Sequence, residues 1–275
     1  MKRILFMIAV IAVFAFSSCA KTDGPQAENN DLAIQDAFLE QISAESDGML
    51  DEIIQLNAAG IVTKSFWGAR FLTGSVTITT RDSSSIRIIT VDFGTTGNVG
   101  VDGKTRTGKL IAYFTRIQNL NAEQKLKYLD YKVDGYLFNG QMIKNITRQI
   151  DSNSQLAVIS ENIKVSFPDG EKSNQRVSNM TRLYKFGVPT TLEDNYIHTF
   201  GTISITNAKG LTQSKVILET NPLIFKVIPG EIIKGIVTNS YSDGRTIVIN
   251  YGDGTIDNTA TATNGTKTWS IKLKK

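Results

Sequence analysis

The sequence has few residues of the types that enzymes use for nucleophilic or metal-assisted catalysis. Its 275 residues include one His and one Cys, which excludes a His/Cys zinc cluster and an intrachain disulfide. A Ser-His-Asp triad would have to use His198, but no G-x-S-x-G segment supplies a nucleophilic serine. Period-two alternation puts His198 on the strand face opposite Ile197, so we interpret it as a surface or strand-edge histidine.

Carboxylates are the other groups that could do acid–base chemistry or bind a hard cation. A glycosidase needs two carboxylates that converge in a cleft, and spacing does not choose among Glu161, Glu219 and Glu231. A hydrolase built on these glutamates is the enzymatic alternative. Asp253 and Asp257 lie four apart in a Gly-rich loop, but a calcium site needs about six oxygen ligands. We interpret both as solvated turn residues and predict no enzymatic activity, no cofactor and no metal.

The N-terminus has the pattern of a bacterial lipoprotein signal peptide. Two basic residues precede a 13-residue apolar run over 4–16, which is shorter than the roughly 20 residues of a membrane-spanning helix. Two serines and then Cys19 follow, and this single Cys stands where such lipoproteins carry the acylated thiol. We predict a cleaved signal peptide over 1–18 and a membrane anchor on acylated Cys19. Because Ala20 rather than Asp comes next, we expect the outer membrane, with the folded part facing the periplasm or the cell surface.

The segment after Cys19 predicts a tether followed by a helix. Residues 19–30 show no apolar periodicity and are mostly polar, which indicates a flexible tether. Residues 31–57 place apolar side chains three, four or seven apart, the spacing of one helical face. We expect one amphipathic helix or two, broken near Asp47 and Gly48. The acidic residues expected on its solvated face are Asp36, Glu40, Glu45 and Glu52.

Residues 58–275 are typical of an antiparallel β domain. β-Branched residues alternate with polar ones, turn dipeptides recur, and no segment has the length of a crossover helix. The expected fold class is mainly β, with roughly a dozen strands in a sandwich or a curved open sheet. Hairpin turns are expected at four pairs, Asn139–Gly140, Asp169–Gly170, Asp243–Gly244 and Asn264–Gly265.

A weak internal repeat indicates that the β domain has two related halves. Residues 74–94 and 235–252 each predict a hairpin with three large apolar residues on one face. Each is followed by a Gly-rich loop and a return strand, over 109–115 and over 267–273. Convergence of unrelated β-hairpins explains the match equally well.

Three aromatic residues, Phe66, Trp67 and Phe71, gather at the junction of the predicted helix and sheet. They could form a platform on which a sugar stacks, or a plug where the helix packs onto the sheet. We favour the plug.

Several segments resemble an uncharacterised family of Bacteroidota outer-membrane lipoproteins. They are TVDFGTTGNVGVDGKTRTGKLIAYF at 90–114, YLFNGQMI at 136–143, VSFPDGEKS at 165–173 and SDGRTIVINYGDGTIDNTATATNGTKTWSI at 242–271. The resemblance implies the location and an all-β architecture and brings no assigned activity. Members tend to carry a Cys in each of two Gly-rich loops, where this chain has Asn98 or Val99 and Ile256. The resemblance therefore implies that packing alone holds these two loops.

Composition and net charge limit the kinds of partner that we expect. With 41% hydrophobic residues and 30 basic against 26 acidic side chains, the chain can bury a sizeable core and lacks the charge excess of a nucleic-acid-binding protein. We expect a membrane-anchored lipoprotein that acts as a non-catalytic binding or structural module, with a protein or a glycan as partner. The alternative is a periplasmic carrier of an apolar ligand, a lipid or a lipoprotein, held in a half-barrel cavity under the helix.

Overall fold

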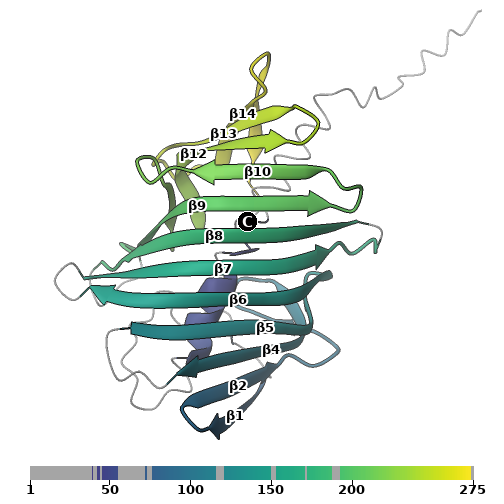
Figure 1. Cartoon of the computed structure of the whole chain (residues 1–275), viewed down its shortest axis with the longest axis vertical. Helices are drawn as coiled ribbons and strands as arrows, with labels where there is room; N and C mark the ends of the chain where they lie inside the picture. Colours follow the sequence, from purple (N-terminus) through teal and green to yellow (C-terminus); the bar gives the residue numbers. More distant parts are fainter. Residues whose placement is uncertain are drawn as a thin grey trace, which may run out of the picture.

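Fifteen strands form one antiparallel sheet around a short helical segment (Figure 1). The structure, a computed structural model, describes residues 39, 42, 43, 45–54, 72, 76–115, 121–149, 153–170, 172–187 and 193–273. Residues 45–54 are helical, as are 39, 42 and 43. In chain order the strands are β1 (Thr77–Ser83), β2 (Ile86–Asp92), β3 (Asn98–Val99), β4 (Thr105–Thr115), β5 (Asn121–Val133), β6 (Tyr136–Gln149), β7 (Ser154–Ser166), β8 (Ser173–Lys185), β9 (Tyr196–Asn207), β10 (Thr212–Ile217), β11 (Leu223–Lys226), β12 (Glu231–Tyr241), β13 (Thr246–Asp253), β14 (Thr259–Thr263) and β15 (Thr268–Lys272).

The strands follow one another across the sheet almost in chain order. The path runs β1-β2-β4-β5-β6-β7-β8-β9-β10-β12-β13-β14-β15, with β3 paired to β4 and β11 paired to both β9 and β12. Antiparallel neighbours need only short turns between them, so the long central strands β5–β9, of 12 to 14 residues, lie side by side. The predicted antiparallel β body is confirmed. It is one continuous sheet in the described residues rather than two sheets facing each other.

The two faces of the sheet have different environments. We call the face against which the helix packs the inner face, and the opposite one the outer face. On β8 the inner-face residues Asn174, Arg176, Ser178, Met180, Arg182 and Tyr184 are all buried, and they alternate with more exposed outer-face residues. Figure 1 looks onto the outer face, with the helix behind the sheet. The core is lined by the inner face along the sheet, from Ile89 on β2 to Ile271 on β15, and by the apolar side chains of the helix.

Three of the four predicted hairpin turns are confirmed and the fourth is wrong. The turns at Asp169–Gly170, Asp243–Gly244 and Asn264–Gly265 each join two consecutive strands, whereas β6 continues through Asn139 and Gly140. Gly140 has a φ of 123°, and a Cβ there would lie 2.1 Å from the backbone oxygen of Asn162 on β7. A glycine inside a strand permits such a kink and such a close approach. This glycine therefore permits the close approach of β6 to β7 instead of closing a turn.

The two segments of the predicted repeat differ in how their return strands pair. Both form antiparallel hairpins, β1–β2 and β12–β13, and each buries its apolar residues, for example Val91 and Ile249. However, β4 pairs directly with β2, whereas β14 lies between β13 and the return strand β15. The organisation into two related halves stays a prediction.

The helix differs from its predicted amphipathic form. It continues through Asp47 and Gly48, and the described side chains of 46–54 are all buried. The prediction of a solvated acidic face is wrong for Glu52, which is 2% exposed and accepts a hydrogen bond from the backbone N–H of Leu72 at 2.8 Å. It is also wrong for Glu45, which forms an ion pair with Lys104. These two acidic residues are buried because a loop lysine and a backbone N–H from the segment before β1 pair with them.

Some predictions fall on residues outside those that the structure describes. They concern the signal peptide (1–18), the tether (19–30) with Cys19, the acidic residues Asp36 and Glu40, and the aromatic residues Phe66, Trp67 and Phe71. Among the described residues, no helix is both long and apolar enough to span a bilayer.

Candidate functional site

An ionic cluster joins the helix to the inner face of the sheet. We use this name for Asp47, Asp51, Lys144 and Arg182. Lys144 Nζ on β6 lies 2.6 Å from Asp47 Oδ1 and 2.8 Å from Asp51 Oδ1, and Arg182 Nη1 on β8 lies 3.0 Å from Asp47 Oδ2. Helical spacing of four residues puts both carboxylates on one face, and strand alternation turns both cations inward. The four-residue spacing on the helix and the two-residue alternation on the strands therefore place these four side chains against one another in the core.

A second buried group of polar residues surrounds Glu161 on β7. Its carboxylate accepts hydrogen bonds from Ser43 Oγ at 2.7 Å and Ser178 Oγ at 2.6 Å, and it pairs with Arg176. Arg182 Nη2 donates to Ser43 Oγ at 2.7 Å, which connects this group to the ionic cluster. A carboxylate that already has three donors is not placed to take a proton from a substrate, so Glu161 has a structural role here.

The ionic cluster holds Lys144 in its protonated form. Burial raises the pKa of Asp51 to about 6, with Lys144 acting in the opposite direction. Burial also acts to lower the pKa of Lys144, but the carboxylates of Asp47 and Asp51 hold that pKa above its usual value. Lys144 therefore stays an ammonium ion, which cannot serve as a nucleophile or a general base.

The other two candidate glutamates have separate surroundings. Glu231, at the start of β12, accepts hydrogen bonds from the backbone N–H groups of Asp257, at 3.1 Å, and Asn258. Glu219 is exposed in the turn after β10. Glu161 and Glu231 thus bind different partners in different parts of the sheet, Glu219 is exposed, and these three glutamates do not converge in one cleft.

The aspartates considered as calcium ligands organise their own turns. Asp253 Oδ1 accepts hydrogen bonds from the backbone N–H of Thr255 at 3.0 Å and its hydroxyl at 2.7 Å. Asp257 Oδ1 accepts one from the backbone N–H of Thr259 at 2.9 Å. These are side-chain-capped turns, and within the described residues no group of three or more His, Cys, Asp or Glu side chains is arranged to hold a metal ion.

Buried charged residues hold the two Gly-rich loops, so the expectation of packing alone is wrong. In the first loop Arg106, 1% exposed, donates two hydrogen bonds to Asp102, at 2.8 and 2.5 Å. Although burial acts to raise it, the pKa of Asp102 is held below its usual value by Arg106. In the second loop Glu231 binds two successive backbone N–H groups. A buried ion pair therefore holds the first loop, and a buried carboxylate holds the second.

His198 lies on the outer face of β9 and has no catalytic surroundings. Its cross-strand neighbours are Leu183 on β8 and Ile224 on β11, while Ile197 points into the core and is fully buried. Partial burial, and to a lesser extent Lys185, lower the pKa of His198. The predicted placement opposite Ile197 is confirmed, and the imidazole is neutral at neutral pH.

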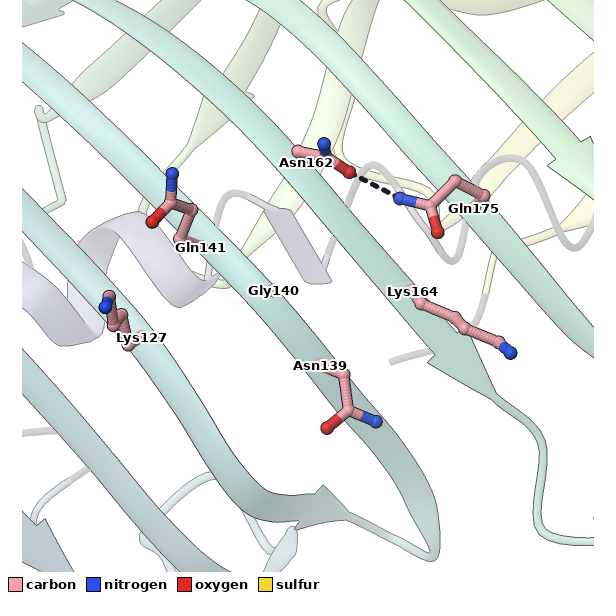
Figure 2. Close-up of a pocket in the computed structure, with 7 residues that line it drawn as sticks. All are labelled: Lys127, Asn139, Gly140, Gln141, Asn162, Lys164 and Gln175. Atoms are coloured by element: carbon pink, nitrogen blue, oxygen red, sulfur yellow. Dashed lines mark hydrogen bonds between the residues drawn. The ribbon is translucent and has the colours of Figure 1, made fainter.

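The outer face has a hollow of about 520 Å³ over β5–β8. We call it the outer-face hollow; Figure 2 shows the residues that line it, Lys127, Asn139, Gly140, Gln141, Asn162, Lys164 and Gln175. Asn162 Oδ1 accepts a hydrogen bond from Gln175 Nε2 at 2.5 Å. Because Gly140 has no side chain and β6 is kinked there, space opens between the flanking side chains. Sequence reasoning missed this site because it assigned Asn139 and Gly140 to a turn.

The chemistry of the outer-face hollow is that of binding. Its amide side chains offer both donors and acceptors, and Lys127 and Lys164 add positive charge. In the part of the chain that the structure describes, neither lysine forms an ion pair; Lys127 Nζ lies 5.7 Å from the ring centroid of Tyr113. The hollow contains no hydroxyl, thiol, imidazole or carboxylate that could act as a nucleophile or general base. It can therefore bind a polar, negatively charged ligand without reacting with it.

Comparisons with protein-family models, curated proteins and solved structures find no match for the chain.

Proposed function

We propose that the protein is an outer-membrane lipoprotein that acts as a non-catalytic binding module and binds its ligand in the outer-face hollow. The observation that carries this proposal is the contrast between the two faces of the sheet. A buried helix packs against the inner face at β6 and β8, whereas the outer face carries a hollow with two lysines that lack ion-pair partners among the described residues. An apolar-ligand carrier would have to use the inner face, where the helix lies.

An acidic glycan fits the outer-face hollow best. A glycan presents many hydroxyl groups, and amide side chains such as those of Gln141 and Asn162 can both donate to and accept from them. Carboxylate groups on the sugars would pair with Lys127 and Lys164. A protein partner is less well matched, because protein interfaces centre on aromatic and apolar anchors, and amide and lysine side chains line this hollow.

Binding of polygalacturonate, an acidic glycan, to the full acylated protein tests the proposed ligand class. Dextran serves as the neutral glycan. We expect Lys127→Gln combined with Lys164→Gln to raise the Kd for polygalacturonate at least tenfold, about 1.4 kcal/mol. The matched control exchanges two exposed lysines that lie in turns and do not line the hollow, Lys209→Gln and Lys267→Gln, with the same change in net charge. Equal affinity of the two double variants, or equal binding of dextran, would overturn the assignment to the hollow.

The membrane anchor is tested by Cys19→Ala. The mature N-terminus then lacks the thiol that carries the acyl chains, so the variant is expected in the soluble fraction of lysed cells. Retention of the Cys19→Ala variant in the membrane fraction would refute the lipid anchor. The binding assay and this fractionation are independent, so either half of the proposal can fail alone.

A further inference from the structure

A row of cross-strand partners continues from the outer-face hollow over the rest of the sheet. The row begins in the hollow, where Lys127 on β5 lies opposite Gln141 on β6, and Gln141 lies opposite Asn162 on β7. Figure 1 shows the strands from β5 to β13 that carry the row side by side. Beyond the hollow the row continues, each residue opposite the next, through Val177, Ser204, Ser214, Ser240 and Thr246. We call the last four of these residues the hydroxyl row.

The side chains of the hydroxyl row are accessible from the outer face. Ser214, Ser240 and Thr246 are exposed, and Ser204 is half-buried. No other residue that the structure describes forms a hydrogen bond with any of these four hydroxyl groups. Each hydroxyl group can both donate and accept a hydrogen bond, so the row can bind a polar ligand directly.

Three strands in this part of the outer face have no charged side chain. In β9, β10 and β14, which the structure describes in full, no outer-face position is Lys, Arg, Asp or Glu. The surface of a soluble protein ordinarily mixes acidic and basic residues, so this composition is unusual. Strand propensity does not account for three aligned serines, because the residues enriched in strands are β-branched or aromatic. An uncharged surface of hydrogen-bonding groups therefore continues from a positively charged hollow.

Exposed aliphatic side chains adjoin the hydroxyl row. Val177, in the same row, is 44% exposed, and Val216, at the outer-face position after Ser214, is 51% exposed. A neutral sugar has hydroxyl groups at its edge and C–H groups on its ring faces, so a surface of hydroxyl and aliphatic groups matches both. A carboxylate placed there would lose water without gaining a cation. This part of the outer face thus fits neutral sugars better than acidic ones.

We propose that the hydroxyl row binds the neutral part of the glycan whose acidic sugar lies in the outer-face hollow. The ligand is then a linear glycan with an acidic sugar at one end of a neutral chain, and it crosses the strands. Adjacent strands lie about 4.8 Å apart, close to the length of one sugar unit, so successive sugars meet successive strands. Seven strand spacings separate Lys127 on β5 from Thr246 on β13. This inference rests on the proposed function, because the hollow holds the acidic end.

Two sialylated glycans test the hydroxyl row, because each has a single acidic sugar at the end of a neutral chain. Sialyllactose has two neutral sugars and reaches little beyond the hollow, whereas sialyl-tri-N-acetyllactosamine has six and reaches across the row. Calorimetric titration of the full acylated protein in detergent gives both Kd values. We expect the longer glycan to bind at least tenfold more tightly. With one acidic sugar in each chain, this gain cannot come from several acidic groups that compete for the hollow. Equal Kd values would overturn the proposal.

A pair of triple variants isolates the hydroxyl groups. Ser204→Val/Ser214→Val/Ser240→Val removes three of them, whereas the same three changes to Thr give nearly the same side-chain shape and keep them. Strands accept both residue types. The valine variant should raise the Kd for the longer glycan at least tenfold and leave that for sialyllactose within about twofold. The threonine variant should leave both within about threefold.

An equal loss in the valine and threonine variants would contradict the role of the hydroxyl groups. If the valine variant does not fold by circular dichroism, the comparison of the two glycans on the unaltered protein decides.

Failure of this inference is distinguishable from failure of the proposed function. Lys127→Gln/Lys164→Gln should weaken both sialylated glycans by the same factor, because both place their acidic sugar in the hollow. If sialyllactose does not respond to this double variant, the proposed function fails and the hydroxyl row is rejected with it. If sialyllactose depends on the lysines and the longer glycan binds no more tightly, the hollow stands and the hydroxyl row alone is rejected.

Discussion

Lys144 Nζ on β6 lies 2.6 Å from Asp47 Oδ1 in the helix, and neither side chain has any exposed surface. Lys144 Nζ also lies 4.7 Å from the ring centroid of Tyr184. A buried charge pair of this kind adds little net stability, but removal of one partner leaves the other uncompensated. The helix is thus tied to the sheet by charges that tolerate substitution poorly.

Lys144→Met is expected to destabilise the protein by about 3–5 kcal/mol, because Asp47 and Asp51 would lose their ammonium partner in the core. Urea unfolding followed by circular dichroism measures the change. Lys127→Met is the matched control, since Lys127 lies on the outer face and is exposed; it should cost less than about 0.5 kcal/mol. Equal losses in the two variants would contradict the role of the ionic cluster.

Asp51 should lower the free energy of unfolding as the pH rises, which is the opposite of the usual effect of an aspartate. Its folded-state pKa of about 6 is above its ordinary value of 3.8, so the folded state binds the proton more tightly than the unfolded state. Its stabilising contribution is therefore complete below pH 3.8 and is lost as the pH rises through about 6. Between pH 4.5 and pH 7.5 the wild type should lose on the order of 2 kcal/mol relative to Asp51→Asn.

Urea unfolding of both proteins at these two pH values measures the contribution of Asp51 together with its interactions with Lys144 and Asp47. A difference between wild type and Asp51→Asn that is the same at pH 4.5 and 7.5 would show that this carboxyl does not titrate in the window.

Gly140→Ala tests the kink in β6. A Cβ at this position would lie 2.1 Å from the backbone oxygen of Asn162, and the positive φ adds strain, so we expect a loss of about 3 kcal/mol. Gly244→Ala is the control, because Gly244 has a φ of 88° and no atom within 4 Å of the added Cβ. Thermal unfolding should show a loss of roughly 1 kcal/mol for the control. If Gly140→Ala costs no more than Gly244→Ala, the close approach does not constrain the strand.

Local pattern predicts the strands well because side-chain alternation and turn residues act over short distances. The alternation around Ile197 and His198 gave the correct inner and outer faces. The same local reasoning failed at Asn139–Gly140. A glycine can be needed because a turn requires a positive φ or because a neighbouring strand leaves no room for a side chain, and the sequence pattern does not distinguish these two reasons. The β7 backbone that occupies the space beside Gly140 is not visible in the local pattern.

The buried charges could not be predicted for a related reason. Acidic residues on a helix are ordinarily exposed unless a partner is buried with them, and here the partners are distant in the sequence. Asp51 and Lys144 are 93 residues apart, and Ser43 and Arg182 are 139 residues apart. Only the pairing of the strands shows that β6 and β8 bring these cations to the helix. The outer-face hollow likewise combines side chains from four strands.

Glu231 offers a test of how the second Gly-rich loop is held. Its carboxylate accepts hydrogen bonds from the backbone N–H groups of Asp257 and Asn258, and Glu231→Ala leaves both without this partner. We expect a loss of about 1–3 kcal/mol and at least tenfold faster hydrogen exchange at these two amides. Glu219→Ala, in an exposed turn, should change neither quantity. Unchanged exchange at 257 and 258 in Glu231→Ala would show that the backbone alone fixes the loop.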